Sequence, residues 1–492
     1  MAIPAAVDLL VVGGGINGAG IARDAAGRGL SVLLVEQEDL AGATSSASSK
    51  LIHGGLRYLE LGEFRLVREA LAEREVTMAM APHLVRPLSF VLPHDKSLRP
   101  RWMLRLGLFL YDHLGGRKRL PPSRRIDPRA DLVGAPLRRD VAAAFVYSDC
   151  QADDARLVIA NARDAARRGA RILRQTELLS AERSGRGWIA ELRLREGRTA
   201  RVEARALVNA SGPWAMSVAK RAGGLHGNAA LRLVKGSHIA VPRLYGGDHA
   251  YILQNDDRRI VFVMPYERDF TLIGTTEEPF DGDPRSVACG EAEATYLCRA
   301  VSRWFAEPLS PAAILWRYAG VRPLYEDHAK NASAVTRDYV LLLEGSADRA
   351  PLLSILGGKI TTFRRLAEHA LERLAPYFPG LPPAWTRGST LPGGEPAGPD
   401  DIRSAYPWLD PTAAERLLRC YGSETHAVLG GAKGPADLGE DFGAGLSARE
   451  VDWMRREEWA ESAEDVLWRR SKLGLRLDGA QKERLAAYLA RN

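Results

Sequence analysis

Residues 8–37, DLLVVGGGINGAGIARDAAGRGLSVLLVEQ, hold seven glycines between two apolar runs. The first run, residues 9–12, has the unbroken apolar character of a strand that is buried on both faces of a parallel sheet. Residues 16–28 have the pattern of a helix with small residues on one side, and residues 31–36 repeat the pattern of a buried strand. The segment therefore predicts a β-α-β unit of about 30 residues.

The glycines of this unit follow the pattern Gly13-x-Gly15-x-x-Gly18, between the first strand and the helix. The first glycine permits a tight turn, the second lets a pyrophosphate approach the backbone, and the third lets helix and strand pack closely. The helix N-terminus favours phosphate, and Glu36 can accept hydrogen bonds from ribose hydroxyls. These features predict a dinucleotide site; the alternative is a tight turn in a domain without a ligand.

The acid at position 36 argues against a 2′-phosphate, but the motif does not separate FAD from NAD. Short hydroxyl side chains follow in residues 43–60, ATSSASSKLIHGGLRYLE. They suit a diphosphate or the edge of a flavin ring, whereas a polar surface loop is the alternative. His53, Arg57 and Tyr58 stand beside a pair of glycines, which favours a segment that faces the cofactor.

The remainder of the chain divides by pattern into a strand-rich centre and a helical end. Amphipathic helices are predicted at residues 63–80 and 152–169, and residues 231–280 are rich in predicted strands. Residues 376–400 have the proline and glycine content of a linker, and residues 401–492 are predicted to be mostly helical.

Composition narrows the class of protein. The chain has 492 residues, 46% hydrophobic and 26% charged, as is ordinary for a globular protein of two or three domains. No stretch approaches the roughly 20 apolar residues of a transmembrane helix, and the N-terminus lacks the basic region of a signal peptide, so we expect a cytoplasmic start. The four cysteines form no CxxC pair and predict neither a zinc site nor disulfides.

The net charge of +7 admits three interpretations: an arginine-rich surface, an anionic substrate or an anionic lipid surface. Nucleic acid is the least favoured partner, because the sequence has no zinc-finger spacing, no RNP-like motif and no basic run with interleaved aromatic residues.

The segment 8–60 resembles the N-terminus of the FAD-dependent sn-glycerol-3-phosphate dehydrogenases, most of all the aerobic bacterial enzymes. The resemblance continues in order through YSDCQADDARL, VNASGPW, LVKGSHIAVP, YAGVRPL, TRDY and GGKITTFRRLAEHAL, and spans nearly the whole chain. It departs at Glu277, where the family commonly has Asp. The calcium-loop pattern of the mitochondrial relatives is absent from residues 401–492, so we expect no calcium regulation, and we expect no metal site.

The resemblance implies an α/β protein with a Rossmann-type FAD-binding domain, a strand-rich substrate domain of the D-amino-acid-oxidase-like kind, and a C-terminal helical domain. It implies oxidation of sn-glycerol 3-phosphate to dihydroxyacetone phosphate by hydride transfer from C2 to FAD, with electrons passed to a membrane quinone. The expected domains are residues 1–80 with 151–225 and 316–385 for FAD, 81–150 with 226–315 for the substrate, and 386–492 at the C-terminus.

The resemblance also assigns individual residues. The substrate phosphate needs cationic side chains, and a base or a positive site must remove the proton of the C2 hydroxyl. The expected catalytic residues are Arg322, His53 and His238, with either histidine as the candidate proton acceptor. The expected substrate-binding residues are Arg57, Tyr58, Arg337 and Lys359. The expected cofactor-binding residues are Gly13, Gly15, Asn17, Gly18, Glu36, Thr44, Ser45, Ser49, Lys50, Leu51, Leu178, Ser211, Gly212, Gly358, Lys359, Ile360 and Thr361.

The family's membrane quinone points to a lipid surface on the cytoplasmic side. Residues 99–120, RPRWMLRLGLFLYDHLGGRKRL, fit a helix that lies in the membrane interface, whereas a solvated helix face over the core is the alternative. Residues 451–475 are a second candidate surface. We expect a homodimer, peripheral on the inner face of the plasma membrane. The competing functions are an oxygen-dependent glycerol-3-phosphate oxidase and a flavin-binding sensor without turnover.

Overall fold

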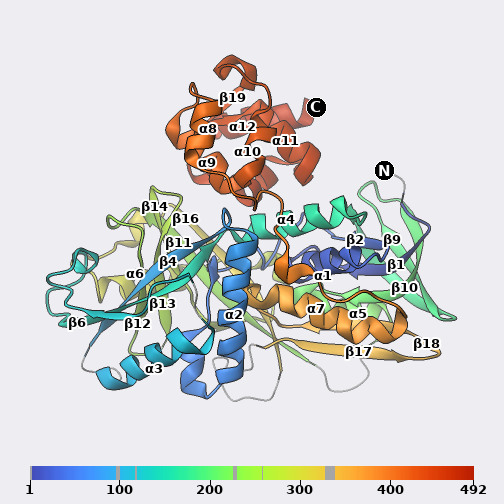
Figure 1. Ribbon diagram of the computed structural model, residues 1–492, viewed down its shortest axis with the longest axis horizontal. Coiled ribbons are helices and arrows are strands. Elements are labelled where there is room, and N and C mark those ends of the chain that lie inside the picture. The colour runs from blue at the N-terminus through green and yellow to red at the C-terminus, as the bar shows by residue number, and fades with distance from the viewer. Residues whose placement is uncertain are drawn as a thin grey trace.

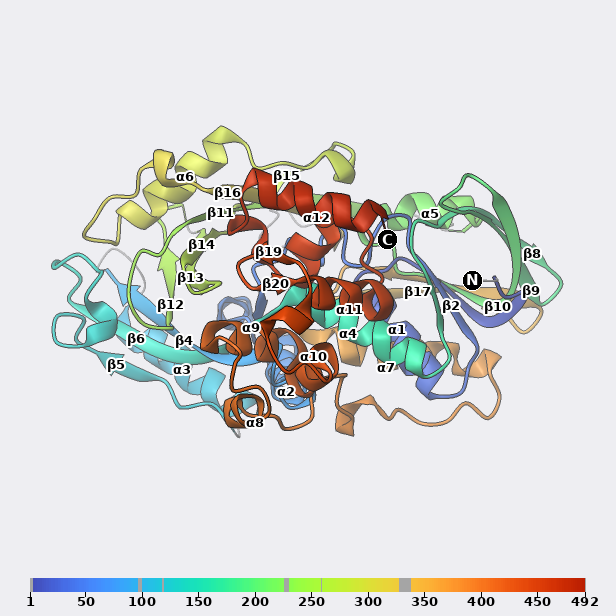
Figure 2. The ribbon, with the colours of Figure 1, turned by 90° about the horizontal axis from the view of Figure 1, so that it is seen from above.

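The computed structural model describes residues 3–95, 100–116, 119–224, 230–257, 259–326 and 338–491. Its elements form two β-sheets side by side, with a helical part above them (Figure 1). Seen from above, this helical part lies over the middle of the molecule, where the two sheets meet (Figure 2).

The first sheet contains the predicted β-α-β unit. β1 (Ala6–Val12) pairs in parallel with β2 (Val32–Val35) on one side and with β10 (Thr199–Asn209) on the other. α1 (Ile16–Gly27) connects β1 to β2, so its N-terminus lies at the carboxyl ends of the central strands. The order is β17-β18-β10-β1-β2-β7, with β9 and β8 added beyond β10. The remaining strands are β7 (Arg171–Leu173), β8 (Glu177–Ser184), β9 (Gly187–Arg193), β17 (Val340–Ser346) and β18 (Arg349–Leu356).

Both faces of β1 are buried, as its unbroken apolar run predicts. Leu9 and Val11 share a core with α1, α4 (Asp154–Arg167) and α7 (Phe363–Leu374). Leu10 packs on the opposite face, in the core that includes α5 (Ala215–Arg221). The three side chains are 0% exposed, so the layered α/β architecture follows directly from this stretch.

The second sheet has ten strands among the described residues, in the order β15-β11-β14-β13-β12-β4-β6-β3, with β16 beside β11 and β5 beside β6. Most of its neighbours are antiparallel, as the strand-rich pattern of residues 231–280 predicts. The strands are β3 (Leu51–Ile52), β4 (Val85–His94), β5 (Arg124–Ile126), β6 (Ala143–Ala152), β11 (Leu231–Pro242), β12 (Ala250–Gln254), β13 (Ile260–Tyr266), β14 (Phe270–Gly274), β15 (Glu278–Pro279) and β16 (Trp316–Tyr325).

Three longer helices accompany this sheet. α2 (Phe64–Met80) lies where the helix at residues 63–80 is predicted, and α6 (Glu291–Ser302) packs on the face that α3 does not cover. α3 (Arg101–Leu114) covers the other face through Leu104, Leu108 and Tyr111.

The C-terminal part has a hydrophobic core of its own. It is mostly helical, as predicted, and also holds one short antiparallel pair of strands, β19 with β20. Its elements are α8 (Pro399–Ala405), α9 (Pro411–Tyr421), α10 (Thr425–Leu429), β19 (Asp441–Gly443), β20 (Leu446–Ser447), α11 (Ala448–Glu458) and α12 (Gly479–Arg491).

The division between the two sheets differs from the predicted domain boundaries at two places. β3 and β16 fall within the ranges expected for the FAD domain, yet both pair in the second sheet. Residues 51–52 and 316–325 therefore belong to the second sheet. In the part of the chain that the structure describes, no helix has the length and apolar character needed to cross a membrane.

Candidate active site

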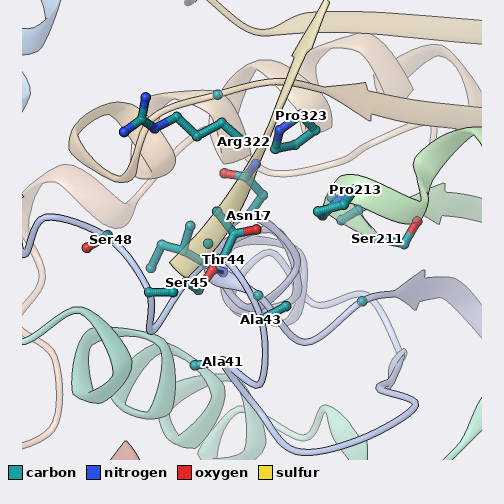
Figure 3. Close-up of a pocket in the computed structure, with 18 of the residues that line it drawn as sticks. Asn17, Ala41, Ala43, Thr44, Ser45, Ser48, Ser211, Pro213, Arg322 and Pro323 are labelled. Carbon is teal, nitrogen blue, oxygen red and sulfur yellow. Dashed lines mark hydrogen bonds between the residues drawn. The ribbon is translucent and has the colours of Figure 1, made fainter. Parts of the chain in front are cut away.

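The main cavity lies between the two sheets, at the carboxyl ends of β1, β2 and β10. In the close-up view, Asn17, Thr44 and Ser45 lie at its centre, Ser211 and Pro213 to one side, and Arg322 and Pro323 above (Figure 3). In open α/β sheets, ligands bind beyond the carboxyl ends of the strands. The fold therefore places this cavity where a dinucleotide is expected.

Glycine is needed at each of the three motif positions for a different geometric reason. Gly13 has φ +113°, and a Cβ there would lie 2.5 Å from the Ala210 carbonyl oxygen. A Cβ on Gly18 would lie 1.9 Å from the Gly13 carbonyl oxygen, so only glycine allows α1 to pack this close. At Gly15, a Cβ would meet only the Ser45 Oγ, at 3.1 Å, and would otherwise project toward the cavity. The turn, the packing and the open approach match the roles predicted for them.

Glu36 lies at the end of β2 and faces the same cavity. Its Oε2 accepts a hydrogen bond from the Gly14 N–H at 2.6 Å, and its Oε1 accepts one from the Glu38 N–H at 3.0 Å. Burial raises the pKa of this carboxyl to about 7, although the two backbone donors act in the opposite direction. Polar hydrogens of a ligand at this position would stabilise the carboxylate form.

The hydroxyl-rich loop is tied to both sheets. Ser45 Oγ accepts a hydrogen bond from the Ile16 N–H at 3.0 Å, at the start of α1. Thr44 Oγ1 donates to the Val321 carbonyl in β16 at 2.6 Å. Ser49 Oγ lies 2.9 Å from His238 Nε2. These contacts hold the loop against the cavity, which the sequence predicts for this segment.

Lys50 does not line this cavity, although it stands in the same loop. Its ammonium is buried and donates to both Asp154 oxygens, at 2.9 and 3.0 Å, and to the Ser46 carbonyl. Lys472 of the C-terminal part reaches the same carboxylate at 3.3 Å. Lys50 therefore fixes the loop to α4 and is not among the lining residues, whereas the sequence predicts a contact with the cofactor.

The other end of the cavity holds the cationic and aromatic groups. The Lys359 ammonium lies 3.8 Å from the centre of the Tyr58 ring. Arg322 donates to Thr275 Oγ1 at 3.0 Å and pairs with Glu277 at 3.3 Å. The longer Glu side chain at position 277 therefore still reaches the guanidinium.

The two candidate histidines differ in their surroundings. His238 is 1% exposed and its ring stacks on Tyr318, with centroids 4.8 Å apart. Burial, helped by the Arg322 charge, lowers the pKa of His238 to about 3, so its ring is neutral at physiological pH. His53 is less buried and also lines the cavity, where its backbone is hydrogen-bonded to Thr361 Oγ1.

Most of the predicted residues meet in this cavity. Arg57 is not among its lining residues, and Arg337 lies outside the described residues. Gly18 contributes through packing rather than by lining the cavity. The predicted residues that line it are Gly13, Gly15, Asn17, Glu36, Thr44, Ser45, Ser49, Leu51, His53, Tyr58, Leu178, Ser211, Gly212, His238, Arg322, Gly358, Lys359, Ile360 and Thr361.

Several lining residues escape the sequence analysis. Thr275 follows a β14 glycine in the IGTT motif, and Gly236 leaves space for a guanidinium, because a Cβ there would lie 2.6 Å from Arg322 Nη2. Phe262 comes from the strand-rich segment, where its apolar character looks like core. Arg221 donates to the Leu178 carbonyl at 2.7 Å. Motif context marks Thr275 and Gly236 in advance, but no local signal marks Phe262 or Arg221.

Two buried polar atoms provide an independent test of the fit to FAD. Asn17 Oδ1 and His238 Nδ1 have no hydrogen-bond partner among the described residues. Both side chains line the cavity, and buried polar atoms are rarely left unsatisfied in a native protein. Together with the open backbone at Gly15 and the carboxylate at Glu36, they fit a large polar ligand such as FAD.

A glycine-bordered cavity on this type of sheet is typical of dinucleotide-binding enzymes, and comparison with known families identifies the dinucleotide as FAD. Residues 8–364 match the family "FAD dependent oxidoreductase". Residues 384–490 match the "C-terminal domain of alpha-glycerophosphate oxidase". The protein is therefore an FAD-dependent oxidoreductase whose C-terminal part is similar to the C-terminal domain of alpha-glycerophosphate oxidase.

Individual relatives narrow the family. The chain is 54% identical to a glycerol-3-phosphate dehydrogenase of Pseudomonas aeruginosa, over 98% of this chain and 94% of that protein. It is 50% identical to D-erythritol 1-phosphate dehydrogenase of Brucella abortus, over 98% of this chain and 97% of that protein. A crystal structure of glycerol-3-phosphate dehydrogenase from Bacillus halodurans, complexed with FAD, matches with a TM-score of 0.80 at 26% identity, over 99% of this chain and 90% of that chain. The chain belongs to the FAD-dependent glycerol-3-phosphate dehydrogenase family.

Proposed function

We propose that this protein oxidises sn-glycerol 3-phosphate to dihydroxyacetone phosphate, with FAD as its cofactor. The 54% identity to the Pseudomonas aeruginosa relative, over nearly the full length of both chains, carries the proposal. Arg322 and Lys359, which line the same cavity, are chemically suited to a small phosphate dianion.

The reaction removes a hydride from C2 and a proton from the C2 hydroxyl. FAD, when bound, supplies the two-electron acceptor. Arg322 is the proposed contact to the substrate, because Thr275 and Glu277 fix the guanidinium at the cavity wall. Lys359 and Tyr58 form the proposed second contact, with the ammonium held over the aromatic ring.

His53 is the proposed proton acceptor. The low pKa of His238, about 3, makes its imidazole a weak base, so it is better suited to hold Ser49 and the ring of Tyr318 in place. The positive charges near the substrate lower the pKa of the C2 hydroxyl and thereby assist the transfer to His53.

The other residues of the cavity are proposed to bind separate parts of FAD. Gly13, Gly15 and the start of α1 are proposed to hold the pyrophosphate, and Glu36 the ribose. Ser211, Gly212 and the segment 357–361 line the cavity farther along and are proposed to border the flavin. The 3-10 turn Ile360–Thr362 leads into α7, so the positive end of the helix dipole suits negative charge on the reduced flavin.

A membrane quinone is the proposed final acceptor, and α3 the proposed contact with the lipid. Exposed apolar side chains follow one face of α3, with exposed fractions of 66% for Trp102, 42% for Met103, 51% for Leu106 and 56% for Phe109. Arg105 is exposed beside them, as expected for a helix at an anionic interface. Such a patch on a soluble protein surface marks an interaction site. A cytoplasmic homodimer on the inner membrane face remains part of this proposal.

A four-carbon sugar alcohol phosphate is the second candidate substrate, because the relative at 50% identity is a D-erythritol 1-phosphate dehydrogenase. The two candidates share a phosphate and a secondary alcohol and differ in the length of the polyol. Steady-state kinetics of the FAD-loaded enzyme with each compound, in the presence of a short-chain quinone analogue, will decide between them. We expect the larger kcat/KM for glycerol 3-phosphate; a larger value for erythritol 1-phosphate would reverse the assignment.

The same kinetic experiment tests the oxidase alternative. Without quinone, an oxygen-dependent enzyme produces one hydrogen peroxide per substrate oxidised. We expect peroxide to be a minor product in air and turnover to rise when the quinone analogue is added. Equal turnover with and without the analogue, at stoichiometric peroxide, would replace the quinone by oxygen.

A further inference from the structure

The loop that carries His53 and Tyr58 is hydrogen-bonded to Tyr111, a buried residue of α3. The Gly54 N–H donates to the Tyr111 hydroxyl at 2.8 Å and over a longer distance, 3.4 Å, to Asp149 Oδ1. The Tyr111 hydroxyl donates to the same Asp149 carboxylate, whose oxygens lie at 2.7 and 2.9 Å. Gly54 stands directly after His53, so this bond acts next to a residue that lines the cavity.

Asp149 is itself held in place. It lies in β6 and is 1% exposed, and Arg74 of α2 donates to its Oδ1 at 2.7 Å. The same Arg74 guanidinium donates to the Ser148 carbonyl at 3.0 Å. One tyrosine hydroxyl thus connects the loop backbone to an ion pair between a helix and the second sheet.

The contact is too close for any residue larger than glycine. A Cβ on Gly54 would lie 2.4 Å from the Leu71 Cδ2 and 2.8 Å from the Tyr111 hydroxyl. Gly55 has φ +77°, and a Cβ there would lie 2.2 Å from the Tyr58 ring. The glycine pair therefore lets the loop rest directly on Tyr111 while Tyr58 turns toward Lys359.

We infer that Tyr111, supported by Asp149 and Arg74, is a positioning residue that sets the place of His53 and Tyr58 in the active site. The inference rests on the proposed function. Tyr111 is 3% exposed and does not line the cavity, so it acts through its contacts with the loop and not on the substrate itself.

The experiment compares Tyr111→Phe with Tyr147→Phe, each as the FAD-loaded enzyme. Tyr147 is a matched control: it is also 3% exposed, its ring makes an edge contact with Tyr111 at 5.8 Å, and no hydrogen bond of its hydroxyl is found within the described ranges. Both changes remove one hydroxyl and keep the ring. Only Tyr111→Phe removes the hydroxyl that Gly54 and Asp149 share, which leaves the Gly54 N–H with the longer bond to Asp149 alone.

Two quantities are measured. Hydrogen exchange of the peptide that spans residues 53–58 reports on the Gly54 N–H, which we expect to lose protection in Tyr111→Phe alone. Steady-state kinetics with glycerol 3-phosphate report on the site: we expect kcat/KM to fall about tenfold in Tyr111→Phe and less than twofold in Tyr147→Phe. FAD content and the flavin absorbance spectrum should match the parent in both.

A third variant separates positioning from loss of stability. Leu108→Ala deletes a buried side chain on the same face of α3 and leaves the Tyr111 hydrogen bonds in place. If it lowers the melting temperature as much as Tyr111→Phe does, it should still keep a larger kcat/KM. An equal loss in Leu108→Ala, or full activity in Tyr111→Phe, would overturn the inference while the proposed function stands. Failure of the parent enzyme to oxidise glycerol 3-phosphate would instead contradict the proposed function.

Discussion

Glu36 carries a carboxyl group whose protonation we expect to change when the cofactor binds. Without a ligand, burial raises its pKa from an ordinary value of 4.5 to about 7. A carboxyl with a raised pKa in the folded state stabilises the fold fully only below 4.5, and this contribution is lost as the pH rises through about 7. Ribose hydroxyls that donate to the carboxylate have the opposite effect, because they favour its ionised form.

We therefore predict that FAD binding releases a proton and that the affinity for FAD weakens as the pH falls below about 7. The dissociation constant can be measured from the quenching of flavin fluorescence by the apoprotein between about pH 5.5 and 8. In Glu36→Gln, binding should be weaker at pH 8 and nearly independent of pH. The same pH dependence in Glu36→Gln as in the parent would show that another group is responsible.

The second prediction at the residue scale concerns Arg322. Arg322→Ala removes the proposed partner of the substrate phosphate, and truncation of one partner of a buried charge pair costs about 2–5 kcal/mol. At 1.4 kcal/mol per tenfold change, kcat/KM for glycerol 3-phosphate should fall by about 30-fold or more, with FAD content unchanged. Arg317→Ala is the matched control on the same strand, because its side chain is 48% exposed and pairs with Glu291 on the surface. A loss in Arg317→Ala as large as in Arg322→Ala would remove the assignment.

Individual residues mark the limit of prediction from sequence. Gly13, Gly15 and Gly18 could be assigned because their roles are local and depend on neighbouring backbone. The ion pair of Lys50 could not be predicted, because its partner, Asp154, stands 104 positions away and no local pattern indicates that pair. Arg57 and Tyr58 are adjacent, yet only Tyr58 lines the cavity, since neighbouring residues of a 3-10 turn point in different directions.

Among the elements, α3 carries a prediction of its own. Its buried face packs on the second sheet, and its opposite face exposes the apolar patch that includes Leu106 and Phe109. Burial of a large apolar side chain contributes about 1.5–3 kcal/mol, so the double variant Leu106→Glu/Phe109→Glu should bind vesicles at least tenfold more weakly. Co-sedimentation with vesicles that contain an anionic lipid measures this.

Leu132→Glu is the control for that experiment, because Leu132 is 89% exposed but lies outside α3. Its vesicle binding should equal that of the parent. If the α3 double variant binds vesicles as well as Leu132→Glu does, α3 is not the contact with the lipid. Residues 451–475 would then be the surface to test.

Elements were predicted better than their pairing. The unbroken apolar run of β1, the amphipathic pattern of α2 and the strand-rich pattern of residues 231–280 are local, and each corresponds to observed elements. The placement of β16 was not predicted, because it pairs with β11, which is about 80 residues earlier in the sequence. The sequence of a strand indicates whether the strand is buried, but it does not indicate which strand pairs with it.

At the scale of the whole molecule, buried ion pairs connect the C-terminal part to the loop that follows Glu36. Asp39, three residues after Glu36, accepts hydrogen bonds from Arg470 at 2.6 and 2.9 Å and from Arg469 at 2.7 Å. Arg470 is 0% exposed. Removal of one partner from such a pair leaves an uncompensated buried charge and costs about 3–5 kcal/mol.

We predict that Asp39→Asn lowers the free energy of unfolding by this amount and weakens FAD binding, because the loop that follows Glu36 loses its anchor. Urea unfolding of apoprotein and holoprotein measures both effects. Asp140→Asn is the control: its pair with Arg138 lies on the surface, at 65% and 50% exposure, so the variant should leave the free energy of unfolding nearly unchanged. Equal stability of Asp39→Asn and Asp140→Asn would contradict the role of this contact.

The central claim is that this chain binds FAD and reduces it with glycerol 3-phosphate. The most direct measurement is an anaerobic titration of the purified holoprotein, followed by the visible absorbance of the flavin. We predict that stoichiometric glycerol 3-phosphate bleaches the flavin band and that glycerol, which lacks the phosphate, leaves it unchanged. A folded protein that takes up no FAD, or a flavin that glycerol 3-phosphate does not bleach, would contradict the account.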